Sequence, residues 1–284
     1  MKRRLFCQYS PTAYRLSVLK ECAKRNVKDA VSGVPFACER STERLPCVLY
    51  RHNSLIRRVL GNTRPELQEN KAVNLALTAP LINGIRIGPG EVFSFWHLVG
   101  KPTQARGYRE GLMIANAQPV SGIGGGLCQF TNLIHWMILH TPLEICEHHH
   151  HDAFDLFPDY NRQVPFGVGT SIAYNYIDYR FRNPTEQQYQ LIVYLTDTHL
   201  CGELRTEQPL PVKYHIQTEE ERFVRIGGQV YRKGKVYRTM VDKTTGKLLN
   251  RELLRENHAL VLYDTDGLEL TIEEDCTESA AGRE

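Results

Sequence analysis

Apolar residues at helical spacing mark the middle of the chain. Between residues 127 and 139 they recur at the i, i+3, i+7, i+10, i+11 positions of one helix face: Leu127, Phe130, Ile134, Met137 and Ile138. Leu133, Trp136 and Leu139 cover most of the opposite side. The pattern therefore predicts a largely buried helix.

Shorter patterns surround this helix. Helical spacing covers residues 13–30 and 70–79, and the second stretch is closed by Pro80 and the turn at Asn83-Gly84. Strands are expected at residues 47–52, 85–87, 112–115, 143–149, 168–182 and 188–195. After Pro211, residues 223–226, 229–232 and 235–238 predict short strands that turn at Gly227-Gly228 and Lys233-Gly234.

These elements predict an α+β fold with mixed strands packed around a buried helix that follows a glycine-rich loop, and with a small C-terminal β unit. We expect an N-terminal accessory segment over residues 1–69, a core over 70–211, and a small β subdomain with a polar tail over 212–284.

The loop before the central helix carries the first candidate chemistry. Four of the five residues from Gly122 to Gly126 are glycine, so the backbone can adopt positive φ and approach a ligand closely. Cys128 follows at the expected helix start, where unpaired N–H groups and the helix dipole favour a thiolate. A nucleophilic cysteine and a small buried hydrophobe are the two interpretations that stay open.

Four consecutive histidines, His148 to His151, end the strand that follows the helix. A helix of about 13 residues advances roughly 20 Å, and a strand from Leu143 to His149 returns about the same distance. If the two are antiparallel, the histidines come back level with Cys128.

Three interpretations of the histidine run compete. One histidine can serve Cys128 as base. Alternatively, His149 and His151 can bind zinc together with Asp152, Asp155 or Cys146. The third interpretation is a solvated strand end.

Asp178 lies within the predicted strand 168–182, on one face with Arg180. It can orient a histidine, or it can pair with a neighbouring arginine.

Composition narrows the function class. The chain is 42% hydrophobic and 24% charged, with a net charge of +3 and basic residues spread along it, so nucleic-acid binding gains no support. Residues 1–31 contain no apolar run like that of a signal peptide or a membrane span, and the eight cysteines include no C-x-x-C pair. We expect a cytoplasmic protein with reduced thiols, no membrane span and no cofactor.

Several stretches, in order and with similar spacing, resemble the VanW family over roughly residues 70–200. They are Ile82-Asn83-Gly84, Pro89-Gly90-Glu91-Val92-Phe93-Ser94-Phe95, Gly124-Gly125-Gly126-Leu127-Cys128-Gln129 and residues 175–183. The tract from His135 to Leu143 is most similar to the short, stand-alone members associated with glycopeptide-resistance clusters.

The resemblance implies a link to peptidoglycan, with a stem peptide or its precursor as partner. Some exported members are thought to act as L,D-transpeptidases, which makes Cys128 the nucleophile and places His149 and His151 at the family's two histidine positions. His148 then replaces an arginine of that pattern, and Gly169 stands where members often carry an aspartate.

On this resemblance the substrate would be bound by a set of loop and neighbouring residues: Gly124, Gly125, Gly126, Gln129 and Asp178. Two alternatives are a non-catalytic module that binds a precursor or a partner protein, and a metal-dependent hydrolase that uses the histidines. Peptidoglycan crosslinking takes place outside the membrane, so a crosslinking role needs an export route that the sequence does not display. Oligomeric state stays open.

Overall fold

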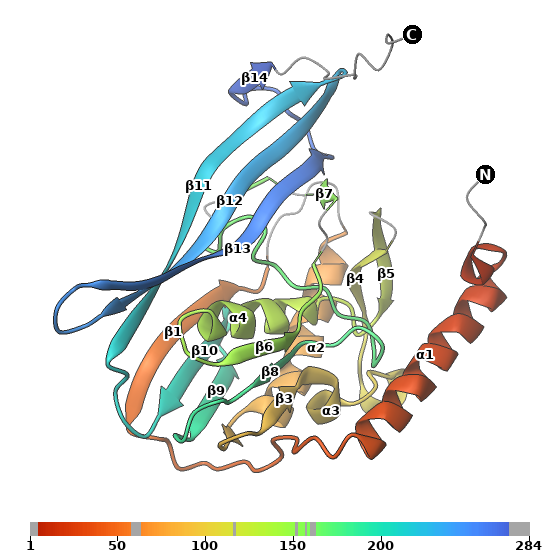
Figure 1. The fold of residues 1–284 in the computed structure, drawn as a ribbon. Coiled ribbons are helices and arrows are strands. Elements are labelled where there is room, and N and C mark those ends of the chain that lie inside the picture. The colour runs from red at the N-terminus through yellow and green to blue at the C-terminus, as the bar shows by residue number, and fades with distance from the viewer. Residues whose placement is uncertain are drawn as a thin grey trace, which may run out of the picture. The chain divides into compact units, whose positions relative to one another are not determined.

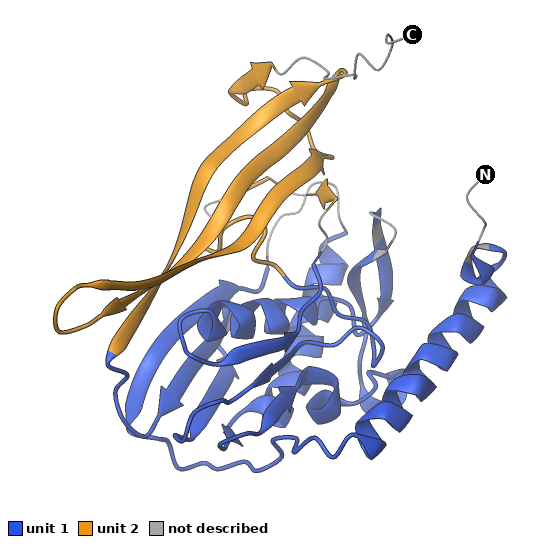
Figure 2. Ribbon diagram, in the orientation of Figure 1, with its two compact units in different colours: residues 1–150, 170–211 blue, residues 151–169, 212–284 orange. Residues whose placement is uncertain are grey.

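The computed structural model describes residues 5–57, 64–115, 118–150, 153–156, 158–159 and 163–272. The chain divides into two compact units, the first made of residues 1–150 and 170–211 and the second of 151–169 and 212–284 (Figure 2). Each unit has its own sheets, labelled in Figure 1.

The main sheet of the first unit is antiparallel, in the order β1-β10-β9-β2. Its strands are β1 (Cys47–Leu55), β2 (Ile85–Ile87), β9 (Tyr189–Leu195) and β10 (His199–Thr206). A three-stranded sheet in the order β3-β8-β6 joins Val92–Ser94, Arg180–Arg182 and Glu144–Glu147. The hairpin of β4 (Glu110–Ala115) and β5 (Gln118–Ile123) leads into the glycine-rich turn.

Four α-helices complete the described part of this unit: α1 (Pro11–Val31), α2 (Pro65–Ile82), α3 (Phe95–Val99) and α4 (Cys128–Ile138). Short 3-10 turns lie at η1 (Phe6–Gln8) and η2 (Gln104–Arg106). No helix in the described ranges is both long and apolar enough to cross a bilayer.

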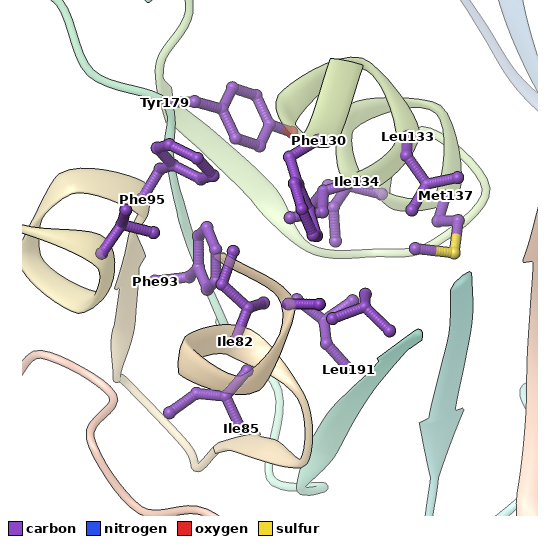
Figure 3. Packing of buried hydrophobic residues seen from close by; sticks show 14 of the residues in the cluster. Ile82, Ile85, Phe93, Phe95, Phe130, Leu133, Ile134, Met137, Tyr179 and Leu191 are labelled. Carbon is purple, nitrogen blue, oxygen red and sulfur yellow. The ribbon is translucent and has the colours of Figure 1, made fainter. Parts of the chain in front are cut away.

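The core of the first unit forms around α4. Phe130 and Ile134 are fully buried and face apolar side chains of α2, β3 and β9, among them Ile82, Phe93 and Leu191 (Figure 3). Burying a side chain of this size contributes about 2 to 3 kcal/mol. The predicted α+β fold, with mixed strands around a buried helix, is thus confirmed, and the helix begins and ends within one residue of the predicted range.

The second unit is a five-stranded sheet in the order β14-β11-β12-β13-β7. Its long strands are β11 (Val212–Ile226), β12 (Gln229–Asp242) and β13 (Leu248–Val261), and its short ones are β7 (Phe154–Asp155) and β14 (Leu270–Ile272).

The three short strands predicted after Pro211 are wrong in length. The turn at Gly227-Gly228 forms, but β12 continues through Lys233-Gly234. Gly234 pairs with Asn257 of β13, and its neighbours Lys233 and Lys235 pair with β11 on either side of a bulge between Glu219 and Arg222. Pairing of this kind keeps a glycine extended that would favour a turn in isolation.

Two further local predictions are wrong. Helix α2 passes through Pro80 and ends at Ile82: the proline removes one N–H donor, but the helix continues past it, the Asn83 N–H donates to the carbonyl of Ala79 at 2.8 Å, and the chain reverses only at Gly84, where φ is +79°. The aromatic run after Val92 ends as a strand at Ser94, whose hydroxyl caps α3 by accepting from the N–H of His97.

The expected long strand over residues 168–182 is extended only at Arg180–Arg182. A tight turn closed by the Ala173–Ile177 bridge, with Asn175 at φ +62°, interrupts the rest of it. Asparagine tolerates this left-handed conformation better than most residues.

Candidate functional site

A buried asparagine of α2 holds the glycine-rich turn. Asn74 has no exposed surface, and its Nδ2 donates to the carbonyl oxygens of Arg109 at 3.0 Å and Gly125 at 2.9 Å. Its Oδ1 accepts from the Arg109 N–H at 2.8 Å. The sequence analysis missed Asn74, although a lone asparagine within the apolar stretch from Ala72 to Ala79 was the available signal.

Close packing explains why the turn is built from glycines. A Cβ on Gly125 would lie 2.1 Å from the backbone of Gly111, which real contacts essentially never allow. Gly124 and Gly126 adopt φ of +78° and +89°. The turn is therefore closely packed, and its shape requires residues without side chains at these positions.

Lys71 of α2 lies against this turn. A Cβ on Gly126 would lie 2.3 Å from Cγ of Lys71, and the lysine is only 8% exposed. Its aliphatic stem thus covers the turn while its charge acts on the next functional group, the thiol of Cys128.

Cys128 is the first residue of α4 and is solvent-exposed. Burial of its thiol among the neighbouring protein atoms nevertheless raises the pKa above the usual value, while the positive charge of Lys71 and the N–H groups of Cys128 and Gln129 oppose that rise. The residue is accessible from solvent on one side and crowded by protein on the other.

The helix start does favour a thiolate, as expected, but the net direction of the pKa shift is upward. The stabilising N–H groups and a cation are present, but the cost of desolvating a thiolate outweighs them.

Gln129 is anchored to β1. Its Nε2 donates to the Oγ of Ser54 at 2.9 Å, to the carbonyl of Ser54 at 3.3 Å and to that of Leu55 at 3.0 Å. This side-chain nitrogen fixes α4 to the sheet edge.

Polar contacts tie the start of α4 to the segment after residue 169. Thr170 donates to Oδ1 of Asn132 from its N–H at 2.7 Å, and its hydroxyl lies 2.5 Å from that of Thr131. The next residue, Ser171, donates its N–H to the carbonyl of His149 at 2.7 Å. The backbone of His149 is thus bonded to Ser171, and the preceding residue, Thr170, contacts Thr131 and Asn132 of α4.

The side chains of His148 and His149 make contacts away from Cys128. His148 stacks on His135 with ring centroids 4.3 Å apart, and His135 lies roughly 10 Å along the helix axis from Cys128. Nε2 of His149 lies 3.1 Å from Oε1 of Glu147. His148 therefore lies level with His135, about two helical turns beyond the cysteine, and the chain after it runs toward Thr131 and Asn132.

His151 and Asp152 lie outside the described residues. Within those residues, no group of three or more His, Cys, Asp or Glu side chains could hold a metal ion.

Asp178 has no exposed surface. Its carboxylate accepts hydrogen bonds from the hydroxyl of Ser94 at 2.5 Å, from the N–H groups of Trp96 and Tyr179, and from Nε of Arg180 at 2.7 Å. Pairing with a neighbouring arginine, the alternative in the sequence analysis, is the arrangement observed. Such burial leaves no surface for a substrate in this conformation.

An ion-pair network missed by the sequence analysis connects α1 to the end of β6. Arg25 donates to both carboxylate oxygens of Glu147, at 2.5 and 2.7 Å, and Arg180 pairs with Asp29. Burial raises the pKa of Glu147, but the hydrogen bonds led by Arg25 outweigh burial and leave the pKa below its usual value. Glu147 is therefore ionised. Arg25 holds its carboxylate in the position where it contacts His149.

Comparison with known proteins places this site in a family. Residues 70–205 match the model of the family described as VanW like protein. The chain is 36% identical over 217 residues, or 76% of each chain, to the vancomycin B-type resistance protein VanW of Enterococcus faecalis.

A weaker similarity, 27% identity over 122 residues, links the chain to the uncharacterized protein YoaR of Bacillus subtilis. That match spans 42% of this chain and 37% of YoaR. No solved structure matches the chain. The matched region contains the glycine turn, Cys128 and the buried Asp178, and on this evidence the chain belongs to the VanW family.

Proposed function

We propose that the protein acts in glycopeptide resistance as a cysteine-dependent acyltransferase on peptidoglycan stem peptides. The observation that carries the proposal is the exposed Cys128 at the first residue of a buried helix, beyond a rigid glycine turn and beside the charge of Lys71. The name of the Enterococcus faecalis relative supports the resistance context.

In the proposed reaction, Sγ of Cys128 gives its proton to a base and attacks the carbonyl carbon of a donor stem peptide. The C–N bond breaks, the leaving amine takes up a proton, and a thioester forms on Cys128. An acceptor amine or water then attacks the thioester and restores the thiol.

The raised thiol pKa makes the base essential, because the thiol is protonated near neutral pH. We propose His149 and His151 for proton transfer, in keeping with the family pattern. The hydrogen bond that Nε2 of His149 donates to the carboxylate of Glu147 must then break when the ring turns toward the cysteine. Lys71 would stabilise the thiolate once formed.

The proposal is tested with stem-peptide muropeptides and mass spectrometry of the products. The native protein is expected to give hydrolysed or exchanged peptides, Cys128→Ala none, and Cys146→Ala the native yield, because Cys146 is another exposed cysteine of the first unit. Equal product with and without Cys128 would contradict the proposal.

A second candidate is a non-catalytic module that binds a stem peptide through the glycine turn. It is favoured by the same raised thiol pKa, since a binding site needs no thiolate. Calorimetry separates the two: a binding module gives equal affinity for the stem peptide in the native protein and Cys128→Ala, with no product from either.

A further inference from the structure

Helix α1 is fixed to the first unit along one broad side, which also carries Asn26, whose Oδ1 accepts from Nδ2 of Asn175 at 2.5 Å. Arg25 pairs with Glu147, Asp29 pairs with Arg180, and Sγ of Cys22 donates to the carbonyl of Tyr174 at 3.2 Å. At about 100° per residue, these three positions fall within roughly 60° of one another on the helix. The side bearing them is the inner side of α1.

Another side, centred about 130° around the helix from the inner side, presents an uncovered apolar stripe. Leu16 is 54% exposed, Leu19 60% and Val27 63%, and the exposed Ala23 and Ala30 lie between them on the surface. These five positions share an arc of about 80°. Solvated helix faces are usually polar, so a stripe of this kind marks a contact surface.

Basic residues border the stripe along both edges. On one edge lies Lys20, about 20° around the helix from Val27, and Lys24 and Lys28 follow it about 40° and 80° further round; on the other edge lies Arg15, and all four are exposed. Phe6 and Tyr9, which precede the helix, are 62% and 65% exposed. An apolar arc with basic borders and nearby aromatic residues is the pattern of a helix that lies in a membrane interface.

We propose that α1 docks the protein onto an anionic lipid bilayer, with Leu16, Leu19 and Val27 among the acyl chains and Lys20, Lys24 and Lys28 on the lipid headgroups. Charge selects this occupant over a second copy of the chain. If two such stripes paired, the lysines of the two copies would come close together and repel each other. The nearby acidic residue Glu21 already lies 4.0 Å from Lys24 of its own helix. Negative headgroups complement the same rows.

The proposal stands apart from the chemistry of Cys128, since neither the stripe nor its borders include residues of the glycine turn. Its test is co-sedimentation of the whole chain with vesicles of phosphatidylcholine alone or mixed with phosphatidylglycerol. Binding to the mixed vesicles, weakening as salt rises, is expected.

Two sets of variants separate the apolar and electrostatic contributions. In the triple variant L16Q/L19Q/V27Q, each leucine change should weaken binding about tenfold. Each change in K20A/K24A/K28A should weaken it about fivefold. Glutamine and alanine are good helix formers, and circular dichroism confirms that α1 persists.

The control is L248Q/L253Q on β13, which removes two leucines that are 54% and 50% exposed outside α1 and should leave binding unchanged. The proposal is overturned if the native protein ignores the mixed vesicles, if it binds both kinds equally, or if L16Q/L19Q/V27Q binds as the native protein does. A dimer that this variant converts to monomer, without vesicle binding by the native protein, would assign the stripe to self-association instead.

Discussion

At the scale of single residues, Cys128 combines solvent access with a thiol that is harder to ionise than an ordinary one. These two properties have opposite effects on reactivity. Access allows a substrate carbonyl to approach, while the raised pKa limits the fraction of thiolate at neutral pH. Lys71 is the residue whose charge moves this balance toward the thiolate.

Alkylation measures the balance directly. The rate of reaction of Cys128 with iodoacetamide, measured by peptide mapping, should rise with pH. Its midpoint should lie above that of an ordinary thiol, which is near pH 9.0. In Lys71→Met the midpoint should move higher, because the stabilising charge is lost while the aliphatic stem is kept. A midpoint well below that of an ordinary thiol would show that burial does not control this group.

Gly125 should tolerate no side chain. In Gly125→Ala the new methyl group meets the backbone of Gly111, and we expect a loss of about 3 kcal/mol of unfolding free energy in urea denaturation. Gly88→Ala is the matched control, since its Cβ would meet only the carboxylate of Glu91, at 3.3 Å. Similar losses in the two variants would argue against close packing as the reason for the glycine.

Part of this residue chemistry could be predicted from sequence. The glycine turn and the cysteine at the helix start follow from local pattern alone. The direction of the thiol pKa shift does not, because it is set by burial in the folded protein and by the charge of Lys71, which is distant in the chain. For the same reason, nothing local shows that Asn74 holds two carbonyls or that Asp178 is completely buried.

At the scale of elements, α1 is attached to the rest of the first unit by buried ion pairs. The side chains of Arg25 and Glu147 are 16% and 15% exposed, so their hydrogen bonds are screened little by solvent. By contrast, Arg57 and Glu69 form a bidentate pair of the same chemistry that is largely solvated.

Removing Arg25 should loosen α1. In Arg25→Met we expect a loss of about 2 kcal/mol in unfolding free energy, because Glu147 keeps a buried charge with fewer donors. Arg57→Met should have little effect. If the two variants are equally stable in urea denaturation, burial of the Arg25 pair contributes nothing.

The same pair predicts an acid sensitivity. The pKa of Glu147 is lower in the folded than in the unfolded chain, so its stabilisation is complete above the usual value of 4.5 and is lost as pH falls through the lowered folded pKa. Native stability should therefore fall below pH 4.5, and Arg25→Met should show a smaller fall. An equal acid slope in both proteins would contradict this assignment.

Elements with strong local periodicity were predictable, and those defined by pairing were not. The spacing of apolar residues fixed α1 and α4 to within two residues of their ends. Gly234 and Pro80 are turn and stop signals by themselves. Pairing of Gly234 with β13 and of its neighbours Lys233 and Lys235 with β11 overrides the first, and Pro80 removes only one hydrogen bond of α2, which continues to Ile82.

At the scale of the whole molecule, the second unit is assembled from distant stretches of chain. Arg232 of β12 is 3% exposed and pairs with Asp155, Asp159 and Glu221, the first two of which come from the excursion over residues 151–169. Its guanidinium also lies 4.5 Å from the ring centroid of Phe166. Residues 151–169 thus contribute to the core of the second unit. The pattern of a continuous stretch of sequence cannot predict this contribution, because the contacting residues are far apart in the chain.

Asp155→Asn should therefore destabilise the second unit selectively. Hydrogen exchange is expected to increase in β7, β11 and β12, because Arg232 and the hydroxyl of Tyr263 both lose the carboxylate they contact. Amides of α4, whose core shares no residue with this network, should keep their protection. Uniformly faster exchange along the chain would mean that the two units unfold as one.

The central claim is that Cys128 becomes acylated by a stem peptide. The most direct measurement is intact-protein mass spectrometry after incubation with a peptidoglycan stem peptide, followed by peptide mapping. We predict a mass increase equal to the donor acyl group, located on the peptide that contains Cys128, released by hydroxylamine and absent in Cys128→Ala. An unmodified Cys128 in a protein that still turns the peptide over, or an adduct on another residue, would contradict the account.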